Sequence, residues 1–178
     1  MASILFFNTS NSSQSINGQL LHAAAALLPR HQADFRSVQD FPLPLFGVDL
    51  EKQGFPEALT TFFAALDAHD AVVFGCAEHN GHVTAAFKNL FDWATRYPRG
   101  EQKIFSGKPV LLLSTSPGAR GAQGAAAWLE KMLGYYNADL VGTYSLGNFG
   151  THFSQGQPDE ATRQALAQAV GRLDDRLS

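Results

Sequence analysis

Residues 71–82 read AVVFGCAEHNGH, and this stretch decides which kind of fold the chain adopts. Residues 71–75 are apolar or glycine with no polar alternation, which is typical of a strand buried on both faces. A polar loop follows at once, and residues 83–97 then repeat apolar side chains at helical spacing. A buried strand, a loop and a helix in this order form the repeating unit of a parallel sheet covered by helices.

The same unit occurs five times along the chain. Short apolar or β-branched runs predict strands at residues 3–7, 34–38, 71–75, 110–114 and 140–144. Helical spacing follows them at residues 20–28, 59–66, 87–94, 125–132 and 166–177. Because parallel strands need crossover helices, the pattern predicts an α/β three-layer sandwich with a five-stranded parallel sheet. Two doubly wound strand orders fit this pattern, which does not choose between them.

The length and composition suit one domain that spans residues 1–178. The chain has 178 residues, of which 45% are hydrophobic, and a net charge of −3 without the basic stripe that nucleic-acid binding needs. The apolar run at residues 4–7 is too short for a signal peptide or a membrane span. Cys76 is the single cysteine, which excludes an internal disulfide and favours a reducing compartment. We therefore expect a cytoplasmic protein that binds neither nucleic acid nor membranes.

Two further segments are unusual. Residues 39–55 contain Pro42, Pro44, Gly47 and Gly54, so we expect a long connection without a regular helix. In the helix at residues 83–97 the apolar arc spans roughly 160°, which is wider than one sheet face usually demands. We expect the extra width to cover a partner subunit.

Three polar loops follow the first, third and fourth predicted strands. In a parallel sheet these loops open on one edge, where ligands bind. Residues 8–17 read NTSNSSQSIN and carry five hydroxyl side chains before a helix, which suits an anion at the helix N-terminus. The alternative is a solvated loop in which Ser13 or Ser15 only caps the helix.

The other two loops suit a flat ligand. Residues 76–82 combine an acid, two histidines, an amide and a glycine, although Asn80-Gly81 is also a common turn sequence. Residues 115–124 read TSPGARGAQG, with three glycines spaced by three that would let the backbone lie against a planar ring. A plain glycine-rich loop is the alternative. The placement of all three loops predicts a ligand cleft near the middle of the sheet.

The sequence also resembles a known family. Residues 77–81 read AEHNG and residues 87–93 read FKNLFDW, and together they resemble the NADPH-dependent FMN reductase family, which typically has PEYNG and LKNAIDW there. Ser15-x-Asn17 at the start of a helix is similar to the family's phosphate loop, and residues 107–118 are similar to its fourth strand and following loop. The family includes flavin, quinone, azo-dye and chromate reductases, and the resemblance covers nearly the whole chain.

This resemblance implies a flavodoxin-like fold with strand order 2-1-3-4-5, FMN as the cofactor, and NADPH or NADH as the electron donor. It also implies a small electron acceptor such as a flavin or a quinone, and a homodimer or homotetramer. Carried over by motif, the FMN-binding residues are Ser10, Ser15, Ile16 and Asn17 at the phosphate, Glu78, His79, Asn80 and Gly81 along the ring, and Ser116 and Gly118 closing it. Arg96, Arg99 and Arg120 are candidates for the phosphate of NADPH.

The chain departs from the family pattern in its charges. The family commonly has an arginine near the position of Asn11, but no lysine or arginine occurs between Met1 and His22. The phosphate would therefore rest on neutral donors, which make weaker hydrogen bonds than charged ones. Histidine replaces tyrosine at His79 and alanine replaces proline at Ala77. Because a flavin performs the chemistry itself, we predict no catalytic residue and no metal site.

Several other activities lack a required residue. A Cys-x5-Arg phosphatase loop from Cys76 needs arginine where the chain has His82, and no Gly-x-Ser-x-Gly elbow occurs. A receiver domain needs acids where the chain has Asn8. His79 and His82 beside Glu78 lack a further ligand with fixed spacing for a metal. Two alternatives stay open: a non-enzymatic flavin-binding electron carrier, and a flavin-free binding protein of the same fold.

Overall fold

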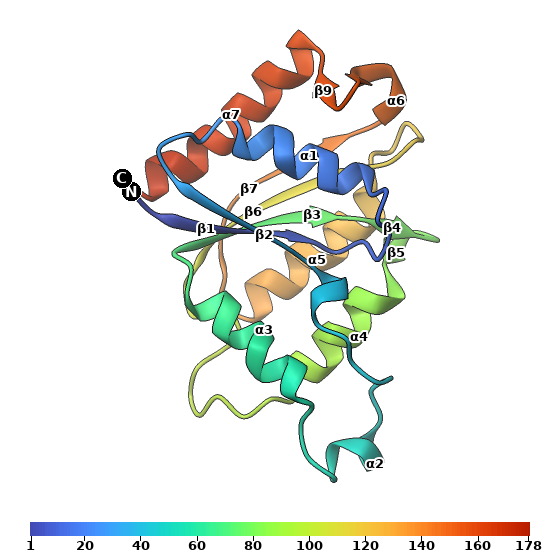
Figure 1. Cartoon of the computed structure of the whole chain (residues 1–178), viewed down its shortest axis with the longest axis vertical. Coiled ribbons are helices and arrows are strands. Elements are labelled where there is room, and N and C mark those ends of the chain that lie inside the picture. Colours follow the sequence, from blue (N-terminus) through green and yellow to red (C-terminus); the bar gives the residue numbers. More distant parts are fainter.

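A computed structural model describes residues 1–178 and contains one five-stranded parallel sheet in the order β2-β1-β3-β6-β7 (Figure 1). This order is the flavodoxin-like 2-1-3-4-5, so the predicted fold class is confirmed. The strands are β1 (Ser3–Asn8), β2 (Gln32–Ser37), β3 (Ala71–Cys76), β6 (Pro109–Thr115) and β7 (Asp139–Leu146).

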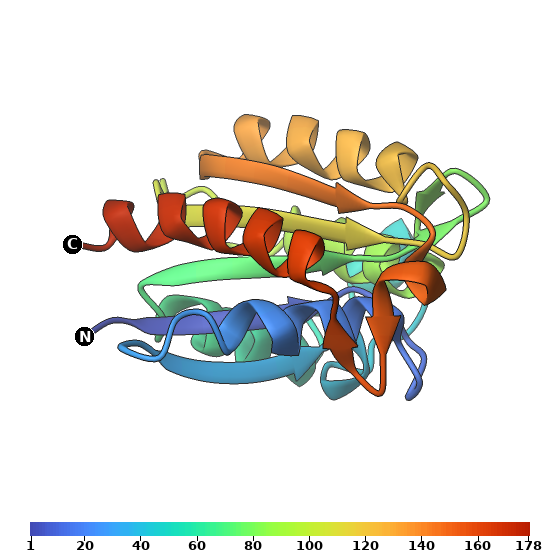
Figure 2. The ribbon, with the colours of Figure 1, turned by 90° about the horizontal axis from the view of Figure 1, so that it is seen from above.

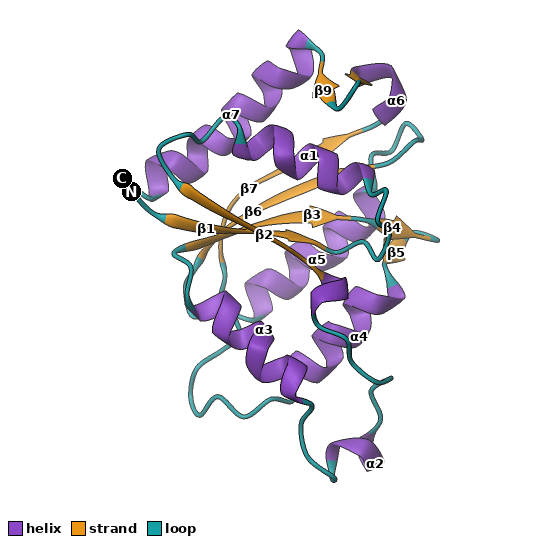
Figure 3. Ribbon diagram, viewed as in Figure 1, coloured by secondary structure: helices purple, strands orange, loops and turns teal.

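Helices cover both faces of the sheet, as the alternation of strands and helices predicts (Figure 3). Side chains alternate along β1, so Ile4 and Phe6 face one apolar cluster while Leu5 and Phe7 face the other. Figure 2 shows α1 and α7 side by side across the first face. The helices are α1 (Ile16–Ala25) and α7 (Glu160–Arg176) on that face, with α3 (Glu57–Asp67), α4 (Ala85–Ala94) and α5 (Gln123–Tyr135) on the other.

The edge strand β2 is the one strand whose predicted position is wrong, since it starts two residues earlier and ends one residue earlier than predicted. The amide of Gln32 donates to the carbonyl of Ala2 at 2.9 Å, which extends the pairing with β1 toward its start. At the other end Ser37 and Asp40 form a capping box, which turns Val38 into the 3-10 helix η1 (Val38–Asp40). Most of β2 is exposed, so apolar periodicity gives little indication of its ends.

The connection at residues 39–55 packs on α4 instead of leaving that helix to a partner. Trp93 is fully buried, and its Nε1 donates to the carbonyl of Pro44 at 2.8 Å. The amide of Phe46 donates to Asn89 Oδ1 at 2.8 Å. The wide apolar arc is therefore covered by the chain's own loop, and the expectation that it covers a partner subunit is wrong.

The same connection contains a helical turn, α2 (Val48–Glu51), which contradicts the expectation of no regular helix. It fits in the four residues after Gly47 because they include neither proline nor glycine. The outer side of the connection is apolar: Leu45 is 84% exposed and Val48 is 60% exposed.

Short elements complete the chain. They are the antiparallel hairpin β4 (Glu78–His79) and β5 (His82–Val83), the helix α6 (Phe149–His152), and the hairpin β8 (Phe153–Ser154) and β9 (Gln157–Pro158). No helix combines the length and the apolar character that a membrane crossing needs.

Candidate functional site

A cavity of about 290 Å³ lies where the loops after β1, β3 and β6 meet. This is the carboxyl edge of the central strands, where open α/β sheets bind ligands. All three polar loops contribute to it, as the sequence predicts. Its lining residues are Ser10, Ser12, Gln14, Ser15, Ile16, Asn17, Ala77, Glu78, His79, Thr115, Ser116 and Pro117.

Two buried threonines join the first loop to the second. Thr9 Oγ1 donates to the carbonyl of Gly75 at 3.2 Å and accepts from the amide of Ala77 at 2.9 Å. Thr84, which caps α4, donates its hydroxyl to the carbonyl of Thr9 at 2.7 Å. The first two loops are therefore held in a fixed relation before any ligand binds.

Asn17 joins the first loop to the third. Its Nδ2 donates to the carbonyl of Thr115 at 3.2 Å, and its Oδ1 accepts from the amide of the same residue at 3.0 Å. The side chain is 4% exposed and both of its polar atoms are engaged. Asn17 can therefore offer an anion its backbone amide but not its side chain.

The N-terminus of α1 presents free hydrogen-bond donors. The first bond inside the helix runs from Gln19 to Ser15, and the amides of Ile16 and Asn17 have no acceptor within the chain. These amides carry the partial positive charge of the helix end, which favours an anion. The predicted phosphate loop thus fits an anionic group without any charged side chain.

Hydroxyl groups of the same loop divide into two kinds. Ser15 Oγ accepts from the amide of Gly18 at 3.2 Å and donates to Asn8 Oδ1 at 3.3 Å, so it acts as the helix cap. Ser10 Oγ and Ser12 Oγ each accept one backbone amide, at 3.1 and 3.2 Å, which leaves both hydroxyl protons free to donate. The sequence analysis missed Ser12 as a phosphate donor. It also assigned the Ser15 hydroxyl to the phosphate, although that hydroxyl is engaged in two bonds within the chain.

The second loop is a tight hairpin, and only some of its side chains lie at the cavity. Asn80 and Gly81 have φ of 53° and 80° and form the hairpin tip, which lies outside the cavity lining. The carboxylate of Glu78 accepts from the amide of Ala125 at 3.0 Å, at the start of α5. Of the predicted ring contacts, His79 is therefore the side chain that stays exposed at the cavity, together with peptide groups of the loop.

Glycines of the third loop serve packing more than ligand contact. A Cβ on Gly124 would lie 2.6 Å from the carbonyl oxygen of Gly81, and Gly121 has φ of 59° against the backbone of Leu146. Gly118 alone faces open space, and the hydroxyl of Ser116 donates to its carbonyl at 3.0 Å. Only Gly118 keeps the predicted role of leaving room beside the backbone.

The three candidate arginines lie in different places. Arg96 pairs with Glu51 at 2.9 Å, and Arg99 pairs with Asp67 at 2.8 Å beside Lys108, which precedes β6 at the opposite edge of the sheet. Arg120 belongs to the third loop, and its side chain is 83% exposed. Arg120 is therefore the one of the three that lies next to the cavity.

Neither a thiol nucleophile nor a metal centre is present at the site. Burial raises the pKa of the Cys76 thiol to about 12, and the nearby carboxylate of Glu78 acts in the same direction. The thiolate, which is the reactive form, is therefore scarce at neutral pH. No cluster of three or more histidine, cysteine, aspartate or glutamate side chains could hold a metal ion.

Sequence reasoning missed several residues of this site: Ser12, Gln14, Ala77, Thr115 and Pro117 in the lining, and Thr9 and Thr84 beneath it. The lining residues carried a signal, since they belong to the three loops that the sequence singled out. Thr9 also belongs to the first of these loops, but its role beneath the lining and that of Thr84 carried no signal, because their bonds join residues 66 to 75 positions apart.

Comparison with known proteins gives consistent matches. A family model described as NADPH-dependent FMN reductase matches residues 2–152. A quinone reductase of Pseudomonas putida is 38% identical over 112 residues, which cover 63% of this chain and 59% of that protein. A second Pseudomonas putida quinone reductase is 37% identical over 163 residues, covering 90% of this chain and 86% of that protein. FerB, a flavoenzyme NAD(P)H:(acceptor) oxidoreductase from Paracoccus denitrificans, aligns with a TM-score of 0.77 at 25% identity, covering 98% of this chain and 96% of that one.

Proposed function

We propose that this chain, which belongs to the NADPH-dependent FMN reductase family and is an NAD(P)H-dependent oxidoreductase with FMN as cofactor, reduces a small quinone. The quinone is supported by the names of the two Pseudomonas putida relatives, which are both quinone reductases. A free flavin is the second acceptor to consider, because the family model is described as an FMN reductase.

The structural observation that supports FMN as the cofactor is the set of free hydrogen-bond donors at the start of α1. The amides of Ile16 and Asn17 and the hydroxyls of Ser10 and Ser12 can all donate to the phosphate of FMN. From there the cavity leads to the second and third loops. We place the ring of FMN between the 78–81 hairpin and Ser116 with Gly118.

FMN, when bound, would supply the redox chemistry, which is hydride transfer from the nicotinamide and electron transfer to the acceptor. The chain's own residues bind the cofactor and orient it toward the substrates. Peptide groups of the hairpin face the ring edge, Asn17 and Thr9 keep the loops at their spacing, and the exposed His79 lies where an acceptor enters. None of these roles requires a side chain to take up or release a proton.

The proposal includes the oligomeric state and the cellular location of the enzyme. We propose a homodimer or homotetramer in the cytoplasm, because the family usually forms such oligomers and because the single cysteine suits a reducing compartment.

Steady-state kinetics test the acceptor. FMN-loaded protein should oxidise NADPH at a rate that rises with the concentration of a simple benzoquinone, with a higher kcat/KM for the quinone than for free FMN. A higher value for free FMN would contradict the quinone assignment. Absence of NADPH oxidation with both acceptors would instead favour an electron carrier.

A further inference from the structure

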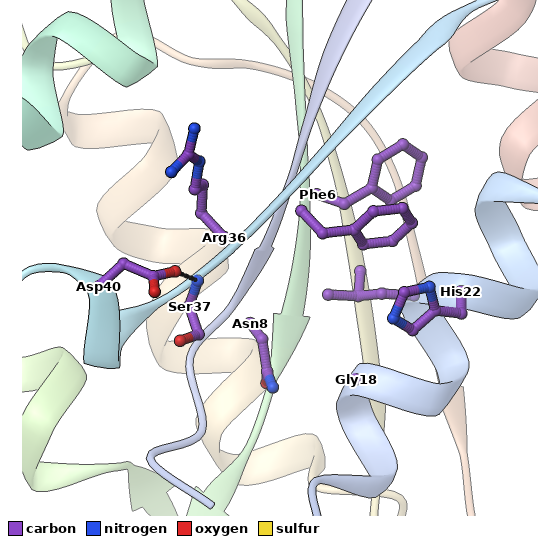
Figure 4. Close-up of a pocket in the computed structure, with 9 residues that line it drawn as sticks. Phe6, Asn8, Gly18, His22, Arg36, Ser37 and Asp40 are labelled. Atoms are coloured by element: carbon purple, nitrogen blue, oxygen red, sulfur yellow. Dashed lines mark hydrogen bonds between the residues drawn. The ribbon is translucent and has the colours of Figure 1, made fainter. Parts of the chain in front are cut away.

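A second cavity, of about 210 Å³, lies between α1 and the ends of β1 and β2 (Figure 4). It shares no lining residue with the cavity assigned to FMN. Figure 4 shows His22 and Phe6 on one side of β2, with Arg36 turned away on the other. The lining residues are Phe6, Asn8, Gly18, Leu21, His22, Phe35, Arg36, Ser37 and Asp40.

One wall of this cavity is aromatic. The rings of His22 and Phe35 stack with centroids 4.1 Å apart, and Phe35 stacks in turn on Phe6 at 5.2 Å. Phe35 therefore lies between two rings and remains 38% exposed, while His22 forms the outer, exposed end of the stack. The outer ring of this stack, His22, accepts a planar heterocycle with little selectivity for its substituents.

The rim offers one free donor and one free acceptor. Asn8 Oδ1 accepts from the amide of Ser10 at 3.1 Å, while its Nδ2 has no partner in the chain. Asp40 uses one oxygen to accept from the amide of Ser37 at 2.7 Å, and its other oxygen has no partner. Adenine presents the matching groups, since its ring nitrogens accept and its exocyclic amine donates.

A polar groove of about 300 Å³ joins this cavity to the phosphate loop. It shares Ser12, Gln14 and Ser15 with the FMN cavity at one end. At the other end it shares Asn8, Gly18 and His22 with the aromatic cavity. A ligand that extends from the flavin site across the start of α1 would therefore follow this groove to the His22 and Phe35 rings.

We propose that the aromatic cavity binds the adenine of an ADP-containing ligand whose phosphates lie in the groove. The inference rests on the proposed function, which supplies such a ligand in NAD(P)H. FAD carries the same ADP group and is the second source. In both cases the ring system acts at the FMN cavity while the adenine is held by His22, Phe35, Asn8 and Asp40.

The test separates the ADP group from the rest of each ligand. Phe35→Ala removes the ring that supports His22 from behind, and it should weaken the binding of ADP to the FMN-loaded protein in calorimetry by about tenfold, the scale of a lost aromatic platform. In kinetics it should lower kcat/KM for NADPH by a similar factor and leave kcat/KM for reduced nicotinamide mononucleotide unchanged. If FAD is the source, the variant should instead weaken FAD relative to FMN on the apoprotein.

Controls make the outcomes distinct. His22→Ala removes the outer ring of the stack and should show the same pattern, and it replaces Phe35→Ala as the test if that variant unfolds the edge strand. Gln32→Ala, exposed at the far end of β2, should change none of these values. The proposal would be overturned if the variants left three quantities unchanged. These are the affinity for ADP, the ratio of kcat/KM for NADPH to that for reduced nicotinamide mononucleotide, and the ratio of the affinities for FAD and FMN. A wild-type protein that binds ADP but does not oxidise NADPH would overturn the proposed function and leave the adenine site standing.

Discussion

Gln14 lies in the wall of the cavity that we propose for FMN and is exposed, so its charge can be changed without disturbing the core. Gln14→Glu places a carboxylate near an FMN phosphate that carries nearly two negative charges. We expect about tenfold weaker binding of FMN, corresponding to about 1.4 kcal/mol of repulsion. Riboflavin, which lacks the phosphate, should bind nearly as before in fluorescence titrations.

Two other substitutions serve as a control and as the opposite change of charge. Gln168→Glu adds the same charge on an exposed position of α7 and should leave both affinities unchanged. Asn11→Arg adds a cation to a loop of neutral donors and should tighten FMN while making its binding sensitive to salt. Equal losses for FMN and riboflavin in Gln14→Glu would contradict the phosphate assignment.

Asn17→Asp is a poor probe of the phosphate, although the resemblance suggested this residue. Its Nδ2 donates to Thr115, and a carboxylate oxygen in that place would face a carbonyl oxygen instead. A loss of flavin would then report a displaced third loop as well as charge repulsion.

Cys76 provides a test that does not involve ligands. Because burial raises the pKa of its thiol to about 12, the reactive thiolate becomes appreciable only as the pH approaches that value. The native protein should therefore resist iodoacetamide at pH 8, and the unfolded protein should react at the rate of a free cysteine. Rapid labelling of native protein, detected by mass spectrometry, would show that Cys76 is accessible.

At the scale of the elements, the third loop depends on the close approach of its backbone to the end of β7. A Cβ on Gly147 would lie 2.2 Å from the carbonyl oxygen of Ala119, so Gly147→Ala must move one of the two segments. We expect a loss of 1–3 kcal/mol of stability, in the range of other overpacked sites, and weaker FMN binding. Thermal melts with and without FMN measure both effects.

Gly171 gives the matched control. It lies in the middle of α7, and nothing lies within 4 Å of the position of its Cβ. Gly171→Ala should therefore raise stability by 0.5–1 kcal/mol, since alanine favours a helix interior. Flavin affinity should not change. If both substitutions lowered FMN binding equally, the loss would not depend on the Gly147 contact.

The central elements could be predicted because they are buried on both faces. The runs at residues 71–75 and 110–114 contain no polar side chain before Ser114. Such short, continuous apolar runs predict buried parallel strands. The edge strand β2 and the turn α2 were misjudged because they are largely exposed, and their ends depend on capping and on tertiary contacts. The wide apolar arc of α4 predicts a covering surface, but the partner subunit expected there is wrong, because spacing alone does not distinguish Pro44 of the same chain from another chain.

At the scale of the whole molecule, the proposed oligomer needs an exposed apolar surface. Trp93 cannot supply it because it is fully buried within its own chain. Leu45 and Val48 lie on the outer side of the connection at residues 39–55 and are exposed. Leu45→Glu combined with Val48→Glu should therefore lower the mass in light scattering toward the 19.2 kDa of one chain, without lowering the melting temperature. An unchanged oligomer would show that the subunits meet elsewhere.

The location of the site could also be predicted at this scale, because a parallel sheet brings the loops after its strands to one edge. The role of each residue within the loops could not be predicted. Whether Ser15 caps a helix or holds a phosphate depends on the hydrogen bonds to Asn8 and Gly18, and whether Glu78 faces a ring depends on its bond to Ala125. Such bonds follow from three-dimensional placement that the order of residue types does not encode.

The most direct test of the central claim is a visible absorbance titration under anaerobic conditions. Protein loaded with FMN should lose its flavin absorbance band when NADPH is added, and the band should return when benzoquinone follows. Both changes should be fast enough to account for steady-state turnover. A bound flavin whose band NADPH does not bleach would contradict the assignment of the chain as an NAD(P)H-dependent reductase.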